Sequence, residues 1–190
     1  IAMVVADAPY LVETSGSRWA RRRLGPLLRG KVSPKEELLV QTLQELLAAG
    51  EKVVVFTQFR KVAVALLRRM HRHFRGEMAL LAQGVSARDR EAIKQAFNEG
   101  SLQLVVATPA GRTGLNLRGG SALIHYDLPW SPSALEQREG RLTRLDSVHR
   151  VIRSVTLILD ESIDGVIWRA LQNKADVVQF LMGQVPVAAG

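Results

Sequence analysis

The sequence predicts an α/β fold in which a parallel β-sheet carries helices on both faces. Five short runs are rich in apolar and β-branched residues, as expected of strands that are buried on both sides. These runs cover residues 53–56, 78–81, 102–107, 122–126 and 155–159. Segments with helical periodicity separate most of these runs, and this alternation is typical of a sheet whose strands run parallel.

The predicted helices have recognisable start and stop signals. Ser33 and Pro34 form an N-cap followed by a first-turn proline, and Gly50 ends the helix that they open. Ser131 and Pro132 repeat the same start signal further along the chain. Helices are predicted over residues 33–50, 62–74, 87–98, 131–145 and 162–182.

Composition limits the class of protein. The chain has 190 residues, of which 47% are hydrophobic, so it can bury the core of a domain. It has no cysteine, which excludes a disulfide framework and a thiolate metal site. The formal net charge of +8 favours a polyanionic partner such as a nucleic acid or a nucleotide. No apolar run approaches the roughly 20 residues of a membrane span, so no membrane partner is expected.

The chain is predicted to divide into three parts. Residues 1–32 are interpreted as a linker, or the end of a preceding element, that carries a basic cluster. This cluster consists of Arg18, Arg21, Arg22 and Arg23. It either contacts nucleic acid or forms a solvated linker. Residues 33–183 form the main lobe and residues 184–190 a flexible tail. The start at Ile1 instead of methionine indicates a piece of a longer protein.

The helix predicted after Ser131 carries an unusual set of cations. At about 100° per residue, Gln137, Gly140, Arg141 and Arg144 project onto one stripe. Neither of these two arginines has an acid at helical spacing, so an external anion, most naturally a phosphate, is the hypothesis. A solvated basic face is the alternative. Arg138 projects off the stripe, so its replacement by alanine is predicted to have little effect.

The loops that follow the strands point to the same ligand chemistry. In parallel sheets the ligand lies at the carboxyl ends of the strands. Thr108 leads into a glycine-rich turn after one strand, and the arginine helix follows another. Glycines allow backbone amides to approach an oxyanion closely. The histidines are scattered, so no metal site is predicted.

Four segments together resemble a known family. VVVFTQF, ALLAQGVSARDREAIKQAFNEG, ATPAGRTGLNL and DLPWSP followed by LEQREGRLTR resemble consecutive motifs of the second RecA-like lobe of superfamily-two helicases. The D-x-x-W-x-P element is similar to that of Swi/Snf-type DNA translocases in particular. The resemblance covers about residues 33–182, and it implies a RecA-like parallel sheet.

The resemblance implies roles for residues near the nucleotide. Arg141 and Arg144 match the arginines that reach the γ-phosphate of ATP held by the other lobe, with Gln137 nearby. Gly114 and Asn116 match the fifth motif, whose end lies close to the nucleotide.

The resemblance also implies a nucleic-acid surface. Thr108 matches a threonine that touches a DNA phosphate, and Gln58 lies in the fourth motif. Arg90 matches an arginine that supports the DNA-facing surface. Arg112 replaces a glycine of the fifth motif and is assigned to the same surface. Two further departures from the family pattern are Thr143 in place of histidine and Leu145-Asp146-Ser147 in place of Ile-Gly-Gln.

The function that the resemblance implies is the C-terminal lobe of an ATP-dependent, DNA-stimulated translocase. The sequence contains neither a phosphate-binding loop nor a D-E-x-H motif, so ATP and Mg²⁺ are expected to be held mainly by an N-terminal RecA-like lobe. The expected partners are that lobe and duplex DNA, and the chain alone is expected to be inactive. An RNA helicase lobe and a non-catalytic nucleic-acid or protein binding module are the alternatives. A bacterial cytoplasm, in association with the nucleoid, is the expected location, or the nucleus in a eukaryote.

Overall fold

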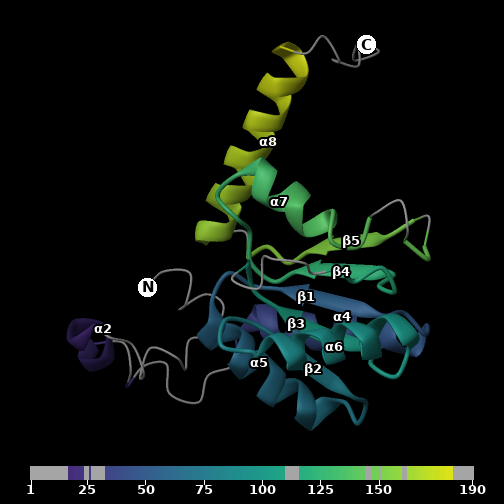
Figure 1. Cartoon of the computed structure of the whole chain (residues 1–190). Helices are drawn as coiled ribbons and strands as arrows, with labels where there is room; N and C mark the ends of the chain where they lie inside the picture. Colours follow the sequence, from purple (N-terminus) through teal and green to yellow (C-terminus); the bar gives the residue numbers. More distant parts are fainter. Residues whose placement is uncertain are drawn as a thin grey trace.

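Five parallel strands form one sheet in the order β2-β3-β1-β4-β5, as Figure 1 shows. The computed structural model describes residues 17–23, 26, 33–109, 116–143, 147–149, 151–159 and 162–181. The strands are β1 (Val53–Phe56), β2 (Met78–Leu81), β3 (Leu104–Ala107), β4 (Ala122–His125) and β5 (Arg153–Thr156). Every pairing is parallel, which confirms the predicted fold class.

Strand β5 departs most from its prediction, since it starts earlier and ends earlier than the apolar run over residues 155–159. It is an edge strand that pairs only with β4, so its outer side tolerates the exposed polar residues Arg153 and Ser154. The apolar run continues past the strand, where the N–H of Leu157 still donates to the carbonyl of His125 at 3.0 Å.

Serine caps begin three of the helices. Ser33, Ser86 and Ser131 each accept a hydrogen bond from a backbone N–H of the following turn. The helices are α2 (Arg18–Arg23), α4 (Pro34–Ala48), α5 (Arg60–His73), α6 (Ala87–Glu99), α7 (Pro132–Glu139) and α8 (Ile163–Leu181). The short helix α2 lies where the sequence predicted a linker or loop.

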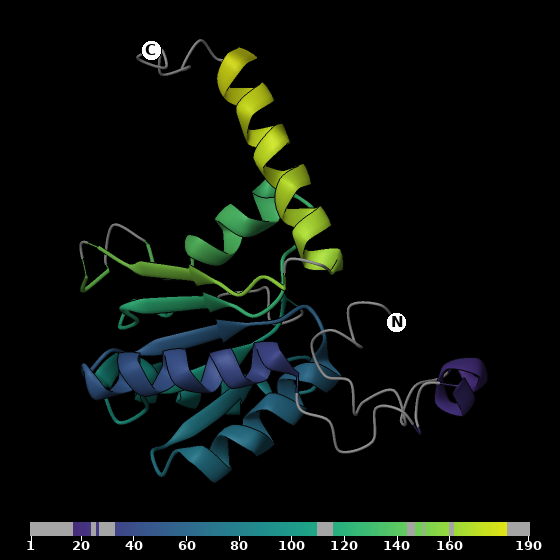
Figure 2. The ribbon, with the colours of Figure 1, turned by 180° about the vertical axis from the view of Figure 1, so that it is seen from behind.

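The sheet has an apolar core on each face. Val53 and Val55 of β1 pack with residues of α4 and α5, whereas Val54 and Phe56 pack on the other side with Phe97 of α6. Figure 2 shows α4 lying across the first of these faces. Alternate residues of one buried strand therefore serve two layers of helices, as the prediction of helices on both faces requires.

Helix α7 is shorter than predicted, because it ends at Glu139 instead of continuing to residue 145. Gly140 is the C-cap, and its N–H donates to the carbonyl of Glu136 at 2.8 Å. Arg141 therefore lies in the turn after the helix, where its N–H donates to the carbonyl of Arg138 at 3.2 Å. The predicted helical stripe is therefore wrong for Arg141, and Arg144 lies outside the described residues.

Helix α8 extends away from the sheet, and its first turns pack against the body (Figure 1). Its base is fixed by a buried ion pair between Asp164 and Lys35 of α4, with Nζ 2.5 Å from the carboxylate. Ile167 and Leu171 pack with Leu128 in a small third cluster. Within the described ranges, no helix has the length and apolar character needed to cross a membrane.

Candidate nucleotide and nucleic-acid site

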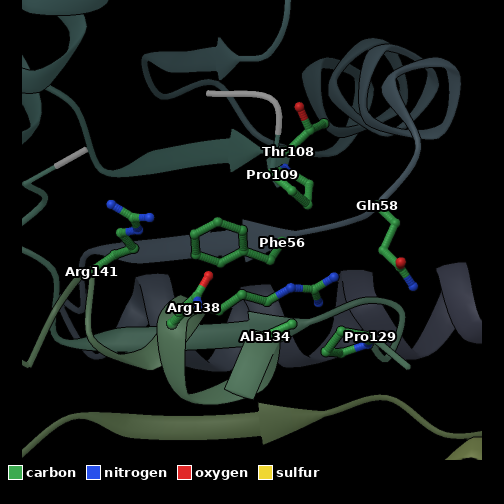
Figure 3. A pocket seen from close by; sticks show the side chains of 9 residues that line it. Phe56, Gln58, Thr108, Pro109, Pro129, Ala134, Arg138 and Arg141 are labelled. Carbon is green, nitrogen blue, oxygen red and sulfur yellow. The ribbon is translucent and has the colours of Figure 1, made fainter. Parts of the chain in front are cut away.

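A small hollow lies at the carboxyl edge of the sheet, between the ends of β1 and β3 and helix α7 (Figure 3). Its lining consists of Phe56, Gln58, Thr108, Pro109, Pro129, Ala134, Gln137, Arg138 and Arg141. In Figure 3, Gln58 and Arg141 lie at opposite sides of Phe56, with Thr108 above it and Arg138 below. The volume of the hollow is about 100 Å³, whereas self-contained small-molecule sites have roughly 300 to 1,000 Å³.

Four residues that the sequence assigned to a site meet in this hollow. Gln58 follows β1, Thr108 follows β3, Gln137 is on α7, and Arg141 follows α7. They come from segments up to about 80 residues apart in the chain, and they meet because the parallel strands end at one edge of the sheet.

Two further predicted residues lie elsewhere. Arg90 of α6 donates from its guanidinium to the carbonyl of Val85 at 3.3 Å. Asn116 lies beside the end of α6, where its carbonyl accepts from Nδ2 of Asn98 at 3.1 Å. Neither lines the hollow. Gly114, Arg112 and Arg144, which were also predicted, lie outside the described residues.

Beneath the hollow, the buried side chain of Asp127 joins three segments. It accepts hydrogen bonds from the hydroxyl of Thr57, from the backbone N–H of Gln58 at 2.9 Å and from Nη2 of Arg138 at 3.2 Å. Nη1 of Arg138 also donates to the carbonyl of Asp127 at 2.6 Å. We call Thr57, Asp127 and Arg138 the Asp127 clasp, since it ties the ends of β1 and β4 to α7.

Burial governs the electrostatics of the clasp. Loss of water raises the pKa of Asp127, while Arg138 and the hydrogen bonds from Thr57 and Gln58 oppose this rise. Burial likewise lowers the pKa of Arg138, and the charge of Asp127 opposes it. Each charge is tolerated at this depth because the other one is present.

The prediction that Arg138 is dispensable is therefore wrong. Its side chain is only 5% exposed, and its guanidinium carbon lies 5.8 Å from the ring centroid of Phe56. Its acid partner Asp127 lies eleven residues earlier in the chain, so the two residues are not neighbours at helical spacing. The signal was present in the sequence as the aspartate that opens DLPWSP.

A buried histidine lies next to the clasp. His125 of β4 has no exposed surface, and its Nε2 is 3.8 Å from a carboxylate oxygen of Glu139. Burial, followed by the positive charge of Arg138, lowers the pKa of His125 to about 4. The imidazole is therefore neutral near pH 7, and the positive charge beneath the hollow belongs to Arg138.

The polar groups around the hollow are suited to an anion. Guanidinium and amide groups donate hydrogen bonds, and Arg141 adds positive charge, whereas the charge of Arg138 is balanced by Asp127. Thr108 is only 1% exposed, and its hydroxyl makes no hydrogen bond to any described residue. The amide of Gln58 donates to the carbonyl of Leu128 at 2.6 Å, so it also holds the start of the segment leading to α7. The size and the donor set fit a phosphate group better than a whole nucleotide.

Comparison with known proteins gives a consistent picture. The family described as "Helicase conserved C-terminal domain" matches residues 35–146. The chain is 28% identical over 135 residues to the ATP-dependent helicase YqhH of Bacillus subtilis, covering 71% of this chain and 24% of that protein. It is 28% identical over 151 residues to the chromatin structure-remodeling complex subunit snf21 of Schizosaccharomyces pombe, covering 77% of this chain and 12% of that protein. The chain thus spans about a quarter or less of the length of these relatives.

A solved structure supports the fold. The Sulfolobus solfataricus SWI2/SNF2 ATPase C-terminal domain superimposes with a TM-score of 0.62 at 22% sequence identity. The match covers 90% of this chain and 64% of that chain. The likeness confirms the predicted RecA-like architecture.

Proposed function

Because the chain belongs to the helicase conserved C-terminal domain family, we propose that it is the C-terminal lobe of an ATP-dependent, DNA-stimulated Swi/Snf-type translocase. One observation carries the proposal: Gln58, Thr108, Gln137 and Arg141 meet in one cationic hollow at the carboxyl edge of the sheet. The lobe comprises residues 33–183, with residues 1–32 as a linker and residues 184–190 as a tail.

In this proposal the part of the hollow formed by Gln137 and Arg141 is half of a nucleotide site. Bound ATP and Mg²⁺ supply the phosphoryl group and the metal charge, and both are held mainly by a facing N-terminal RecA-like lobe. Arg141, with Arg144 as its predicted partner, stabilises negative charge that develops on the γ-phosphoryl group. Gln137 lines the same hollow as Arg141. Asn116 lies outside the hollow, but the N–H of its neighbour Leu117 donates to the carbonyl of Arg141 at 3.2 Å, and we assign Asn116 and Gly114 to the nucleotide side. The small volume of the hollow supports this assignment, since a second lobe is needed to enclose a nucleotide.

The remaining predicted residues are assigned to duplex DNA. Thr108, Gln58, Arg90 and Arg112 form the proposed nucleic-acid side of the lobe, and the net charge of +8 favours contact with phosphates. Phosphate contacts position a protein on DNA without reading its sequence, so binding is expected to be non-specific. Closure of the two lobes on ATP and their opening after hydrolysis move the chain along the duplex.

ATP hydrolysis by the isolated chain and by the full-length protein that carries it tests this function. The isolated 190-residue chain is expected to hydrolyse no ATP, because the phosphate cradle and the magnesium ligands lie on the other lobe. The full-length protein is expected to hydrolyse ATP faster with duplex DNA than with single-stranded RNA. DNA-stimulated turnover by the isolated chain, or stimulation of the full-length protein by RNA alone, contradicts the proposal.

A further inference from the structure

The outer face of helix α5 is strongly basic, and no residue of this helix lines the hollow. The helix, Arg60–His73, contains no aspartate or glutamate. Its basic residues are Arg60, Lys61, Arg68, Arg69, His71, Arg72 and His73. Half of the fourteen residues of a single helix thus carry a basic side chain.

Three of these residues form a straight line on the helix. Lys61, Arg68 and Arg72 are exposed and, at about 100° per residue, project within roughly 40° of one another. The buried residues Ala63 and Met70 project to the opposite side, where they belong to the apolar core. We call Lys61, Arg68 and Arg72 the α5 cationic face. At about 1.5 Å per residue, it extends along roughly 16 Å of the helix.

Folding of the helix does not account for this charge. Cations in the last turn interact favourably with the helix dipole, but Arg60 and Lys61 are in the first turn, where cations are unfavourable and which contains no acidic residue. Arg69 pairs with Glu36 of α4 at 2.9 Å. On α5 itself, no acid stands three or four residues from Arg68 or Arg72.

The α5 cationic face has no anchor for a protein partner. Protein interfaces depend on buried aromatic or aliphatic anchors, and charged residues are depleted at their centres. The exposed large hydrophobic residues of the described chain lie on other segments, namely Leu38, Trp130, Val148, Val151 and Val166. A row of cations without an apolar anchor is suited to a regular polyanion.

From these observations we propose that the α5 cationic face binds the sugar–phosphate backbone of duplex DNA. Its length of roughly 16 Å corresponds to about five base pairs of 3.4 Å each. Helices α5 and α6 cover opposite faces of the sheet, but both begin at its carboxyl edge, where Arg60 of α5 donates to the carbonyl of Gln83 at 2.8 Å and Arg90 of α6 donates to that of Val85 at 3.3 Å. The contact therefore extends from the DNA side of the proposed function along the outer face of α5.

Salt-dependent binding of fluorescent duplex DNA to the 190-residue chain tests the inference. The variant Arg68→Gln/Arg72→Gln removes two charges from the α5 cationic face. Each phosphate contact contributes about 0.9 to the slope of log affinity against log salt, so the magnitude of the slope falls by about 1.8. The loss of affinity is the same for duplexes of unrelated sequence.

The matched control is Arg153→Gln/Arg169→Gln, which removes two exposed arginines from β5 and α8. This variant keeps the native slope, and the melting temperatures of both variants match that of the native chain. A native slope in the α5 variant overturns the inference. An equal fall in both variants also overturns it, because total charge then explains the effect.

The inference uses the same kind of ligand as the proposed function, so a third variant separates the two. Arg90→Gln alters the predicted DNA side on α6 and leaves α5 intact. If Arg90→Gln weakens binding and the α5 variant does not, the inference fails and the proposed function stands. A chain that binds no duplex DNA contradicts both.

Discussion

The Asp127 clasp and the α5 cationic face use the same residue type in opposite ways. Arg138 is almost fully buried, and its charge is matched by Asp127 within 3.2 Å. Arg68 and Arg72 are exposed, and their helix contains no acid. A buried charge depends on its partner for its stability, whereas an exposed charge is stabilised by water. The first arginine therefore affects folding when it is removed, and the other two affect binding.

The largest effect on stability is expected at the clasp. Arg138→Ala leaves Asp127 as a buried carboxylate without its cation, so the free energy of unfolding is expected to fall by about 3–5 kcal/mol. Urea unfolding measures this change. The double variant Arg138→Met/Asp127→Leu removes both charges and is expected to recover most of the loss. A change of less than about 0.5 kcal/mol in Arg138→Ala contradicts the role assigned to the clasp.

A smaller and pH-dependent effect is expected at His125. Its pKa is about 4 in the folded chain against 6.5 in the unfolded chain, so only the unfolded chain binds this proton between these pH values. The free energy of unfolding therefore falls as the pH falls from 6.5 to 4, by up to about 3 kcal/mol from this group.

Urea unfolding of the native chain and of His125→Asn at several pH values measures the contribution of His125 protonation to the free energy of unfolding. The native chain is expected to lose more stability than the variant over this range, whatever the difference between them at pH 7. Parallel curves for the two proteins show that the histidine does not titrate as its burial predicts.

The smallest effect is expected on the α5 cationic face. Arg68→Ala and Arg72→Ala, tested singly, are expected to change the free energy of unfolding by no more than about 0.5 kcal/mol, since each side chain is exposed. Thermal unfolding of each variant and of Arg138→Ala compares the stability lost in the two regions. If either variant loses as much free energy of unfolding as Arg138→Ala, these arginines stabilise the fold, and the two regions do not differ in the way described.

The fold was predictable because buried parallel strands have a simple signal. β1 and β2 lie where their apolar runs predicted. Side chains of both strands pack in the apolar clusters on the two faces of the sheet, so nearly every position favours an apolar residue. The bounds of β5 differ from the prediction because pairing with β4, and not hydrophobicity alone, determines which residues of an edge strand are extended. The predicted end of α7 is too late, although Gly140 is a helix stop signal. The prediction treated Arg141 and Arg144 as helical, and this carried the helix past the glycine.

The site was predictable only in part. The rule that ligands bind at the carboxyl edge brought Gln58, Thr108 and Arg141 to one place. The clasp was not predicted, because Asp127 and Arg138 belong to segments whose contact depends on the path of the turn between β4 and α7. Spacing along a helix reports only neighbours on that helix, so an arginine without a local acid can still be a paired and buried residue.

Two arginines three residues apart have different proposed roles: Arg141 acts on the nucleotide, while Arg138 holds the edge of the sheet together. DNA-stimulated ATP turnover per folded molecule of Arg141→Ala in the full-length protein tests the role of Arg141 most directly. Turnover is expected to decrease roughly 10³-fold or more, as for an arginine that stabilises the transferred phosphoryl group, with the melting temperature and duplex DNA affinity unchanged. Native turnover per folded molecule together with a lowered melting temperature contradicts this role.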